Sequence, residues 1–135
     1  MIVVDTNVIS YLLLPGAWTV LAQAAARQAP WCAPLLWRSE FRNVLAVYMR
    51  QKGLATADAQ SLMEIAENML WGREFTVRST AVLGCVARSQ RSAYDCEFVA
   101  LALDLGIPLV TTDEALIADF PNTAIHLRDF VKGGE

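Results

Sequence analysis

The sequence predicts an α/β domain of three layers (α/β/α), in which helices cover both faces of a mostly parallel, five-stranded sheet. Two observations lead to this prediction. Short apolar runs alternate with longer stretches of helical periodicity along the chain. The first run, residues 2–4, lacks polar alternation, which is typical of a central strand covered on both faces. At 135 residues and without an internal repeat, we expect one domain, residues 1–135.

In the first half of the chain, proline, glycine and threonine mark the ends of the expected elements. Pro15 and Gly16 end a short helix, and Gly53 ends a long one. Thr56 opens a further helix as its N-cap. An apolar run between two prolines forms the second strand. The expected elements are strand 2–4, helices 8–14 and 17–28, strand 31–33, and helices 36–51 and 56–70.

In the second half, Ser92 opens a helix that ends just before Gly106. Pro108 stands near the first position of an apolar run, where a strand tolerates proline. His126 is expected on an edge strand near the surface, and residues 132–135 are expected to form a polar tail. The expected elements are strand 74–77, helices 79–88 and 92–105, strand 107–111, helix 113–119 and strand 124–127.

Composition restricts the class of protein. The hydrophobic content of 55% is high for this size, which buried strands and an interface with a second copy or a partner would explain. Residues 6–26 carry no charge, but Asp5 stands where a signal peptide has positive charge, and Pro15-Gly16 interrupts the run. We therefore expect a cytoplasmic protein that does not enter a membrane. The three cysteines are widely spaced and are expected to be buried and unpaired.

The net charge of −3 argues against nucleic-acid binding, because nucleic-acid binders carry basic faces. That argument weakens if several acids are gathered in a metal site. If four carboxylates bind metal, the rest of the chain has a charge of +1, because −3 loses four negative charges. Acidity alone therefore does not exclude nucleic-acid binding.

Four acidic residues stand where one site can collect them. Asp5 and Asp113 each follow an apolar strand, and ligands bind at the carboxyl ends of strands in open α/β sheets. If these strands are neighbours, about 4.8 Å apart, the two carboxylates approach one site. Thr111 is expected to orient the carboxylate of Asp113. Glu40 and Asp95 share helical faces with apolar side chains, where an unpaired acid is costly.

Each acid also has a structural interpretation. Asp5, Asp95 and Asp113 could cap helices or lie in their first turns, and Glu40 could pair with a neighbouring arginine. Together, however, two carboxylates ~4 Å apart repel by about 4 kcal/mol at an effective dielectric near 20, so a cluster of four requires counter-charge. Oxygen-only ligands favour Mg²⁺ or Mn²⁺, and the single histidine disfavours zinc or iron.

These motifs resemble those of PIN domains. They are Val-Val-Asp-Thr-Asn at 3–7, Ser-Glu-Phe at 39–41, Tyr-Asp and the apolar positions after it in 94–102, and Val-Thr-Thr-Asp at 110–113. Their order and the chain length resemble in particular the VapC-type toxins of bacterial toxin–antitoxin pairs. The resemblance covers essentially the whole chain. It implies a sheet in the order 3-2-1-4-5, Mg²⁺- or Mn²⁺-dependent cleavage of single-stranded RNA, a homodimer, and inhibition by a small antitoxin.

The resemblance also implies roles for individual residues. The acids that it marks as catalytic and metal-binding are Asp5, Glu40, Asp95 and Asp113. The polar residues that would support them are Thr6, Asn7 and Thr111. Glu97, two residues beyond Asp95, is a second acid of that helix whose participation stays open. The candidates by position for RNA phosphate contacts are Arg38, Arg42, Arg88 and Arg91.

Surfaces for partners are expected on apolar helices, because such helices form grooves for partner helices. The uncharged helices in 6–26 and the helix in 56–71 are therefore the expected subunit or antitoxin surfaces. The four tryptophans are expected in the core or in interfaces, rather than as platforms for bases.

Two other functions compete with the nuclease. A Mg²⁺-dependent phosphotransfer domain would need either a second aspartate two residues after Asp5, where Asn7 stands, or a lysine after a late strand, which is missing. A catalytically silent PIN-like binding module would keep the fold for a partner. The intact set of four acids argues against this module and favours metal-assisted hydrolysis of a phosphodiester.

Overall fold

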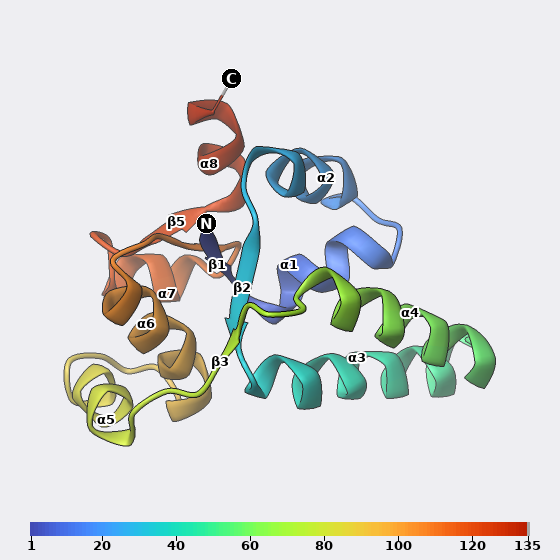
Figure 1. The fold of residues 1–135 in the computed structure, drawn as a ribbon, viewed down its shortest axis with the longest axis horizontal. Coiled ribbons are helices and arrows are strands. Elements are labelled where there is room, and N and C mark those ends of the chain that lie inside the picture. Colours follow the sequence, from blue (N-terminus) through green and yellow to red (C-terminus); the bar gives the residue numbers. More distant parts are fainter. Residues whose placement is uncertain (135) are drawn as a thin grey trace.

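The structure is a computed structural model that describes residues 1–134, and within them it contains five strands and eight helices (Figure 1). The strands are β1 (Ile2–Val4), β2 (Trp31–Pro34), β3 (Glu74–Phe75), β4 (Leu109–Thr111) and β5 (Ala124–His126). The helices are α1 (Thr6–Leu13), α2 (Thr19–Gln28), α3 (Leu36–Lys52), α4 (Thr56–Met69), α5 (Ser79–Ala87), α6 (Ala93–Leu105), α7 (Glu114–Asp119) and α8 (Leu127–Gly133).

The five strands form one parallel sheet in the order β3-β2-β1-β4-β5, which confirms the predicted order. The central strand β1 is completely buried, as its unbroken apolar sequence predicts. It pairs with β2 on one side and with β4 on the other, where Val4 lies opposite Val110. The carboxyl ends of β1 and β4 therefore lie next to each other.

Helices cover both faces of the sheet, as expected for three layers. Helices α1 to α4 lie on one side and α5 and α6 on the other (Figure 1). The chain runs from β1 outward to β3 and then returns across the sheet to β4 on the other side of β1. In parallel α/β sheets, ligands bind at the carboxyl ends of the strands where the strand order reverses in this way. Here that point lies between β1 and β4.

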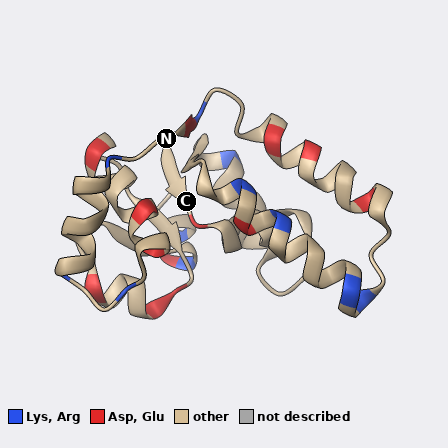
Figure 2. Ribbon diagram, turned by 90° about the horizontal axis from the view of Figure 1, so that it is seen from below, with Lys and Arg blue, Asp and Glu red and all other residues tan. Residues whose placement is uncertain are grey.

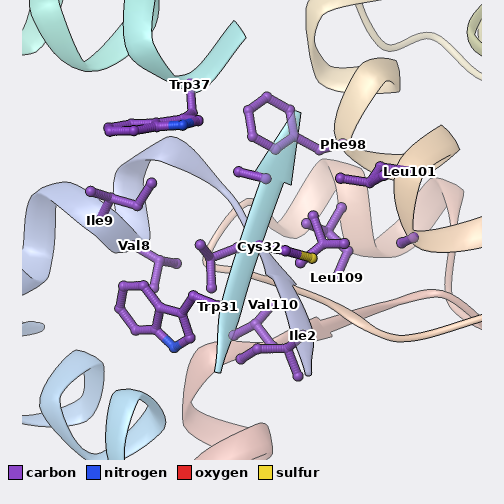
Figure 3. Packing of buried hydrophobic residues seen from close by; sticks show 14 of the residues in the cluster. Ile2, Val8, Ile9, Trp31, Cys32, Trp37, Phe98, Leu101, Leu109 and Val110 are labelled. Carbon is purple, nitrogen blue, oxygen red and sulfur yellow. The ribbon is translucent and has the colours of Figure 1, made fainter. Parts of the chain in front are cut away.

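The core lies between the sheet and these helices. Figure 3 shows side chains of β1, β2 and β4 surrounded by Ile9 of α1, Trp37 of α3 and Phe98 of α6. Full burial of a large apolar side chain contributes roughly 1.5–3 kcal/mol, so these contacts hold the helices on the sheet. All three cysteines are buried and free, which confirms the expectation from their spacing.

The uncharged segment 6–26 forms α1 and most of α2, two short helices as expected. The turn between them is held by Thr19, whose hydroxyl accepts from the amide of Gly16 at 2.9 Å and donates to the carbonyl of Tyr11 at 2.7 Å. No helix within residues 1–134 has the length and apolar character needed to cross a membrane.

The carboxyl-terminal end differs from the expectation of a strand followed by a polar tail. Leu127 and Val131 are buried one turn apart, so α8 has an apolar face that packs against α2. The ring of His126 caps this helix, because its Nδ1 accepts from the amide of Arg128 at 3.0 Å. His126 is therefore buried and not at the surface, where we expected it.

Strand β3 is shorter than the expected strand 74–77. It lies at the edge of the sheet and pairs only with β2, through Ala33 opposite Glu74 and Pro34 opposite Phe75. With no strand on its other side, the pairing stops where β2 ends.

Candidate active site

The four acids marked by the sequence line one pocket of about 440 Å³. Asp5 follows β1, Glu40 lies in α3, Asp95 lies in the first turn of α6, and Asp113 follows β4. Among the residues that the structure describes, no lysine or arginine lines this pocket. The fold thus gathers four carboxylates from four elements at the point where the strand order reverses.

Asp5 is held by two hydrogen bonds. Its Oδ1 accepts from the amide of Asn7 at 3.3 Å and caps α1, and its Oδ2 accepts from the hydroxyl of Thr111 at 2.7 Å. We expected Thr111 to orient the carboxylate of Asp113, and that expectation was wrong. The Thr111 oxygen instead accepts from the amide of Asp113 at 3.0 Å. The reason is the register of β1 against β4, which places Asp5 beside Thr111.

Glu40 is held by Thr6, the first residue of α1. The hydroxyl of Thr6 is buried and donates to Oε1 of Glu40 at 2.7 Å. The alternative pairing of Glu40 with Arg38 does not occur, because Arg38 binds Glu74 and Glu67 instead. Glu40 is therefore half-buried beside the pocket with a hydroxyl as its partner.

Asp95 lies in the first turn of α6 and Asp113 is the N-cap of α7, as their structural interpretation predicted. Ser92 caps α6 by accepting from the amide of Asp95 at 3.0 Å. Asp113 caps α7, because its Oδ1 accepts from the amide of Leu116 at 3.1 Å. The cap uses only Oδ1 of Asp113. Capping and participation in the pocket are therefore compatible, since each carboxylate has two oxygens.

Burial and like charge both act on the acids of the pocket. Burial is the largest cause that raises the pKa of Asp5, and the charges of Asp95 and Asp113 raise it further, against the hydrogen bond from Thr111. Burial also raises the pKa of Glu40 and of Asp95. The charged form of three acids in this pocket is therefore disfavoured, and a nearby cation would stabilise that charged form.

Glu97 lies outside this group. Burial raises its pKa, and its charge contributes to the raised pKa of Glu40. However, its side chain lines a neighbouring hollow beside Ser79 and Leu83, not the pocket of the four acids. Of Asp95 and Glu97, the structure therefore brings Asp95 to the pocket.

The donor set of the pocket fits a hard divalent cation. Carboxylate oxygens are the preferred ligands of Mg²⁺ and Mn²⁺, and the walls supply no basic side chain to balance them. The side chains are not arranged as a closed metal centre: within residues 1–134, no three acidic, histidine or cysteine side chains are grouped closely enough to hold an ion. The chemistry of the pocket thus fits a divalent cation, and the four carboxylates line the pocket in an open arrangement.

Two of the four candidate arginines are bound by acids. Arg38 donates to Glu74, with Nε 2.6 Å from Oε2, and also pairs with Glu67. Arg91 pairs with Asp119, with Nε 3.1 Å from Oδ2. Their charges are therefore already balanced within the protein. Arg91 nevertheless lies near enough to Asp95 to lower its pKa against the effect of burial.

The other two arginines are exposed. Arg88 lies over the ring of Phe120, with Cζ 5.6 Å from the ring centre. Arg42 lies on α3, which carries most of the basic side chains in its part of the molecule, whereas α4 beside it carries only acidic ones (Figure 2). Arg42 is exposed and lies on the same helix as Glu40. Of the four candidate arginines, it is the only one that forms neither an ion pair nor a ring contact within residues 1–134.

The structure adds pocket residues that the sequence analysis did not select. They are uncharged and come from α3 and α6: Leu36, Ser39, Asn43, Val44 and Tyr94. Those of α3 stand one or four residues before Glu40 and three or four after it. The helical period around Glu40 was the signal that would have found them. Tyr94 directly precedes Asp95 in the sequence. Only the structure, in which both residues lie in the first turn of α6, shows that both line the pocket.

The fold and the pocket together define a class: a parallel α/β domain with an acidic site where its strand order reverses. The chain belongs to the PIN-domain family, whose family model matches residues 2–121. PIN domains are generally nucleases, and they typically use divalent metal ions.

Solved structures share the fold of this chain. FitAcB from Neisseria gonorrhoeae is 17% identical with a TM-score of 0.76, over 95% of this chain and 99% of that chain. PAE2754 from Pyrobaculum aerophilum is 18% identical with a TM-score of 0.76, over 98% and 95%. FitAB bound to an IR36 DNA fragment is 18% identical with a TM-score of 0.69, over 94% and 95%. No curated protein matches the chain.

Proposed function

We propose that this protein is a Mg²⁺- or Mn²⁺-dependent endoribonuclease that hydrolyses phosphodiester bonds of single-stranded RNA. One observation carries the proposal: four carboxylates from four elements line one pocket that no lysine or arginine lines among the described residues. Such a pocket attracts hard cations and disfavours the phosphate backbone unless a cation is present.

The residues of the pocket have separate tasks in this mechanism. Asp5, Asp95 and Asp113 hold the cation, with Glu40 either direct or through water. A cation bound there supplies Lewis-acid chemistry at the scissile phosphate. Thr111 keeps the Asp5 carboxylate oriented. One of the acids would accept the proton of the attacking water.

The cellular role follows from the resemblance to VapC-type toxins. We propose that the protein is the toxin of a toxin–antitoxin pair, acts in the cytoplasm as a homodimer, and is inhibited by a small antitoxin. An apolar groove of about 200 Å³ between α3 and α4 supports a helical partner, since Leu45, Met49 and Met63 line it. Arg42 stands at the same groove and is the preferred candidate for an RNA phosphate contact.

The test is cleavage of RNA by the purified protein without any partner. RNA is incubated with the wild type and Mg²⁺, with chelator, and with the Asp5→Asn variant. We expect cleavage by the wild type with Mg²⁺ and loss of cleavage in the other two reactions. The matched control is Asp129→Asn, because Asp129 is an exposed acid on α8 that does not line the pocket.

Two results would contradict the proposal. Cleavage that survives both the chelator and Asp5→Asn would exclude the metal mechanism. Binding of RNA without cleavage at any Mg²⁺ or Mn²⁺ concentration would favour the silent binding module. Calorimetric titration with Mn²⁺ adds a readout that does not depend on the substrate, since the wild type is expected to bind the ion and Asp5→Asn is not.

A further inference from the structure

The pocket has an uncharged wall that cleavage itself does not use. Residues 36, 39, 40, 43 and 44 of α3 all line it, and this spacing places them on one helical face over more than two turns. Glu40 is the one acid of that face. The rest of the face offers aliphatic side chains, a hydroxyl and the amide of Asn43.

Tyr94 stands on α6 and lines the same pocket. It is 64% exposed, although it lies one residue from the half-buried Asp95. The cap between Ser92 and the amide of Asp95 fixes the helix start that carries the ring. Single exposed aromatic residues are ordinary on protein surfaces, so its position at the acids is the informative feature.

The charge of the pocket limits how it can hold a nucleotide. No basic side chain lines it within residues 1–134, and its four carboxylates repel phosphate. Apart from a bound cation, attraction must therefore come from uncharged contacts. Stacking of a base on an aromatic ring is the strongest contact of that kind, and one such ring typically changes affinity by roughly 5- to 100-fold.

We propose that Tyr94 and Asn43 form a subsite for an unpaired nucleobase next to the scissile phosphate. The ring of Tyr94 stacks on the base, and the side-chain amide of Asn43, which can both donate and accept, bonds its edge. The inference rests on the proposed ribonuclease function. A base inside a duplex has both faces covered and its pairing edge occupied, so this wall selects single strands.

The first test is cleavage kinetics with the RNA that the wild type cuts, offered as a single strand and as a duplex. We expect Tyr94→Leu to lower kcat/KM on the single strand by roughly 5- to 100-fold and Tyr94→Phe to restore it. Asn43→Ala is expected to weaken discrimination between bases. The matched control is Leu83→Ala, because Leu83 is 61% exposed on α5 and lies outside the pocket lining.

The second test locates the base directly. A short single-stranded RNA with 5-iodouridine at every uridine is mixed with the wild type and Ca²⁺, irradiated, and the crosslinked peptide is sequenced by mass spectrometry. We expect the crosslink on Tyr94. Crosslinks only at other residues, or an unchanged kcat/KM for Tyr94→Leu, would overturn the subsite.

These outcomes separate the subsite from the function on which it rests. A crosslink on Tyr94 without cleavage of any RNA would support the subsite and contradict the nuclease. Metal-dependent cleavage that is indifferent to Tyr94→Leu would support the nuclease and contradict the subsite. Thermal melting checks that each variant is folded. Replacing the exposed ring of Tyr94 is expected to leave the fold intact.

Discussion

At the scale of single residues, two threonine hydroxyls fix how the acids of the pocket point. Thr111 donates to Asp5 and Thr6 donates to Glu40, each at 2.7 Å. Groups that orient a metal ligand typically change metal affinity by about 10- to 100-fold when they are removed. These hydroxyls are therefore part of the site, although they are not expected to bind the ion themselves.

Thr111→Val is expected to weaken Mn²⁺ binding by about 10- to 100-fold, because Asp5 loses the hydrogen bond that orients it. Valine keeps the shape of the buried threonine, so the strand is expected to remain folded. Isothermal titration calorimetry measures the effect. Thr80→Val, at an exposed position of α5, is the control, and equal Mn²⁺ affinity in both variants would contradict the assigned role.

The buried carboxyl of Asp5 predicts a pH dependence of stability in the cation-free protein. Folding raises its pKa, so folding favours the protonated form. The stability that Asp5 contributes is therefore present below its unfolded pKa of about 3.9 and is lost as pH rises through the higher folded pKa. Asp5→Asn removes this loss because asparagine carries no charge.

We expect Asp5→Asn to be more stable than the wild type at pH 7 in the presence of chelator, and the difference to shrink as the pH is lowered toward 4. Urea unfolding across this pH range measures the two free energies. A variant that is less stable than the wild type at pH 7 would show that the Asp5 charge is already compensated.

At the scale of secondary-structure elements, ion pairs fasten the first turn of α3. Arg38 bridges to Glu74 of β3 and to Glu67 of α4, and the indole of Trp37 donates to the same Glu74 at 2.8 Å. Arg38 lowers the pKa of Glu74, so this pair is charged in the folded state. The network holds the helix that carries Glu40.

Arg38→Met is expected to destabilise the fold by roughly 1–3 kcal/mol, because it leaves Glu74, whose side chain is 10% exposed, without its charged partner. The matched control is Arg78→Met, since Arg78 pairs with Asp104 but is 70% exposed. That change is expected to cost less than Arg38→Met, because solvent screens an exposed ion pair. Chemical denaturation compares them, and equal losses would contradict the role of burial.

Most elements could be predicted from local sequence, and the exceptions have physical causes. Unbroken apolar runs identify the central strands. Gly53 and Gly106 end their helices at positive φ, as expected. Helix α8 was missed because only two of its residues are buried and its cap is a histidine. The predicted strand 74–77 was longer than β3 because an edge strand ends where its partner strand ends. The sequence alone does not reveal where that pairing stops.

At the scale of the whole molecule, the acids were easier to predict than their partners. Acids at strand ends and on apolar helical faces are visible in sequence. The bond between Thr111 and Asp5 depends on the register of β1 against β4, which only the assembled sheet fixes. Tyr94 and Asn43 were overlooked because exposed aromatic rings and surface amides are common in any sequence. Only their position at the pocket of the four acids distinguishes them.

A divalent cation that binds the folded pocket is expected to stabilise the whole molecule. At a free concentration 100-fold above its dissociation constant, the gain is about 2.7 kcal/mol. Mn²⁺ should therefore raise the melting temperature of the wild type and leave that of Asp5→Asn unchanged. An equal rise in both proteins would place the ion elsewhere.

The bond between Asp5 and Thr111 joins residues 106 positions apart. During synthesis on the ribosome, the first strand emerges long before the strand that completes its surroundings. Contacts of such high sequence separation form late, because the entropy of closing the intervening loop opposes them. A growing chain that has not reached Thr111 therefore has no assembled pocket, and its carboxylates come together only after β4 has paired with β1.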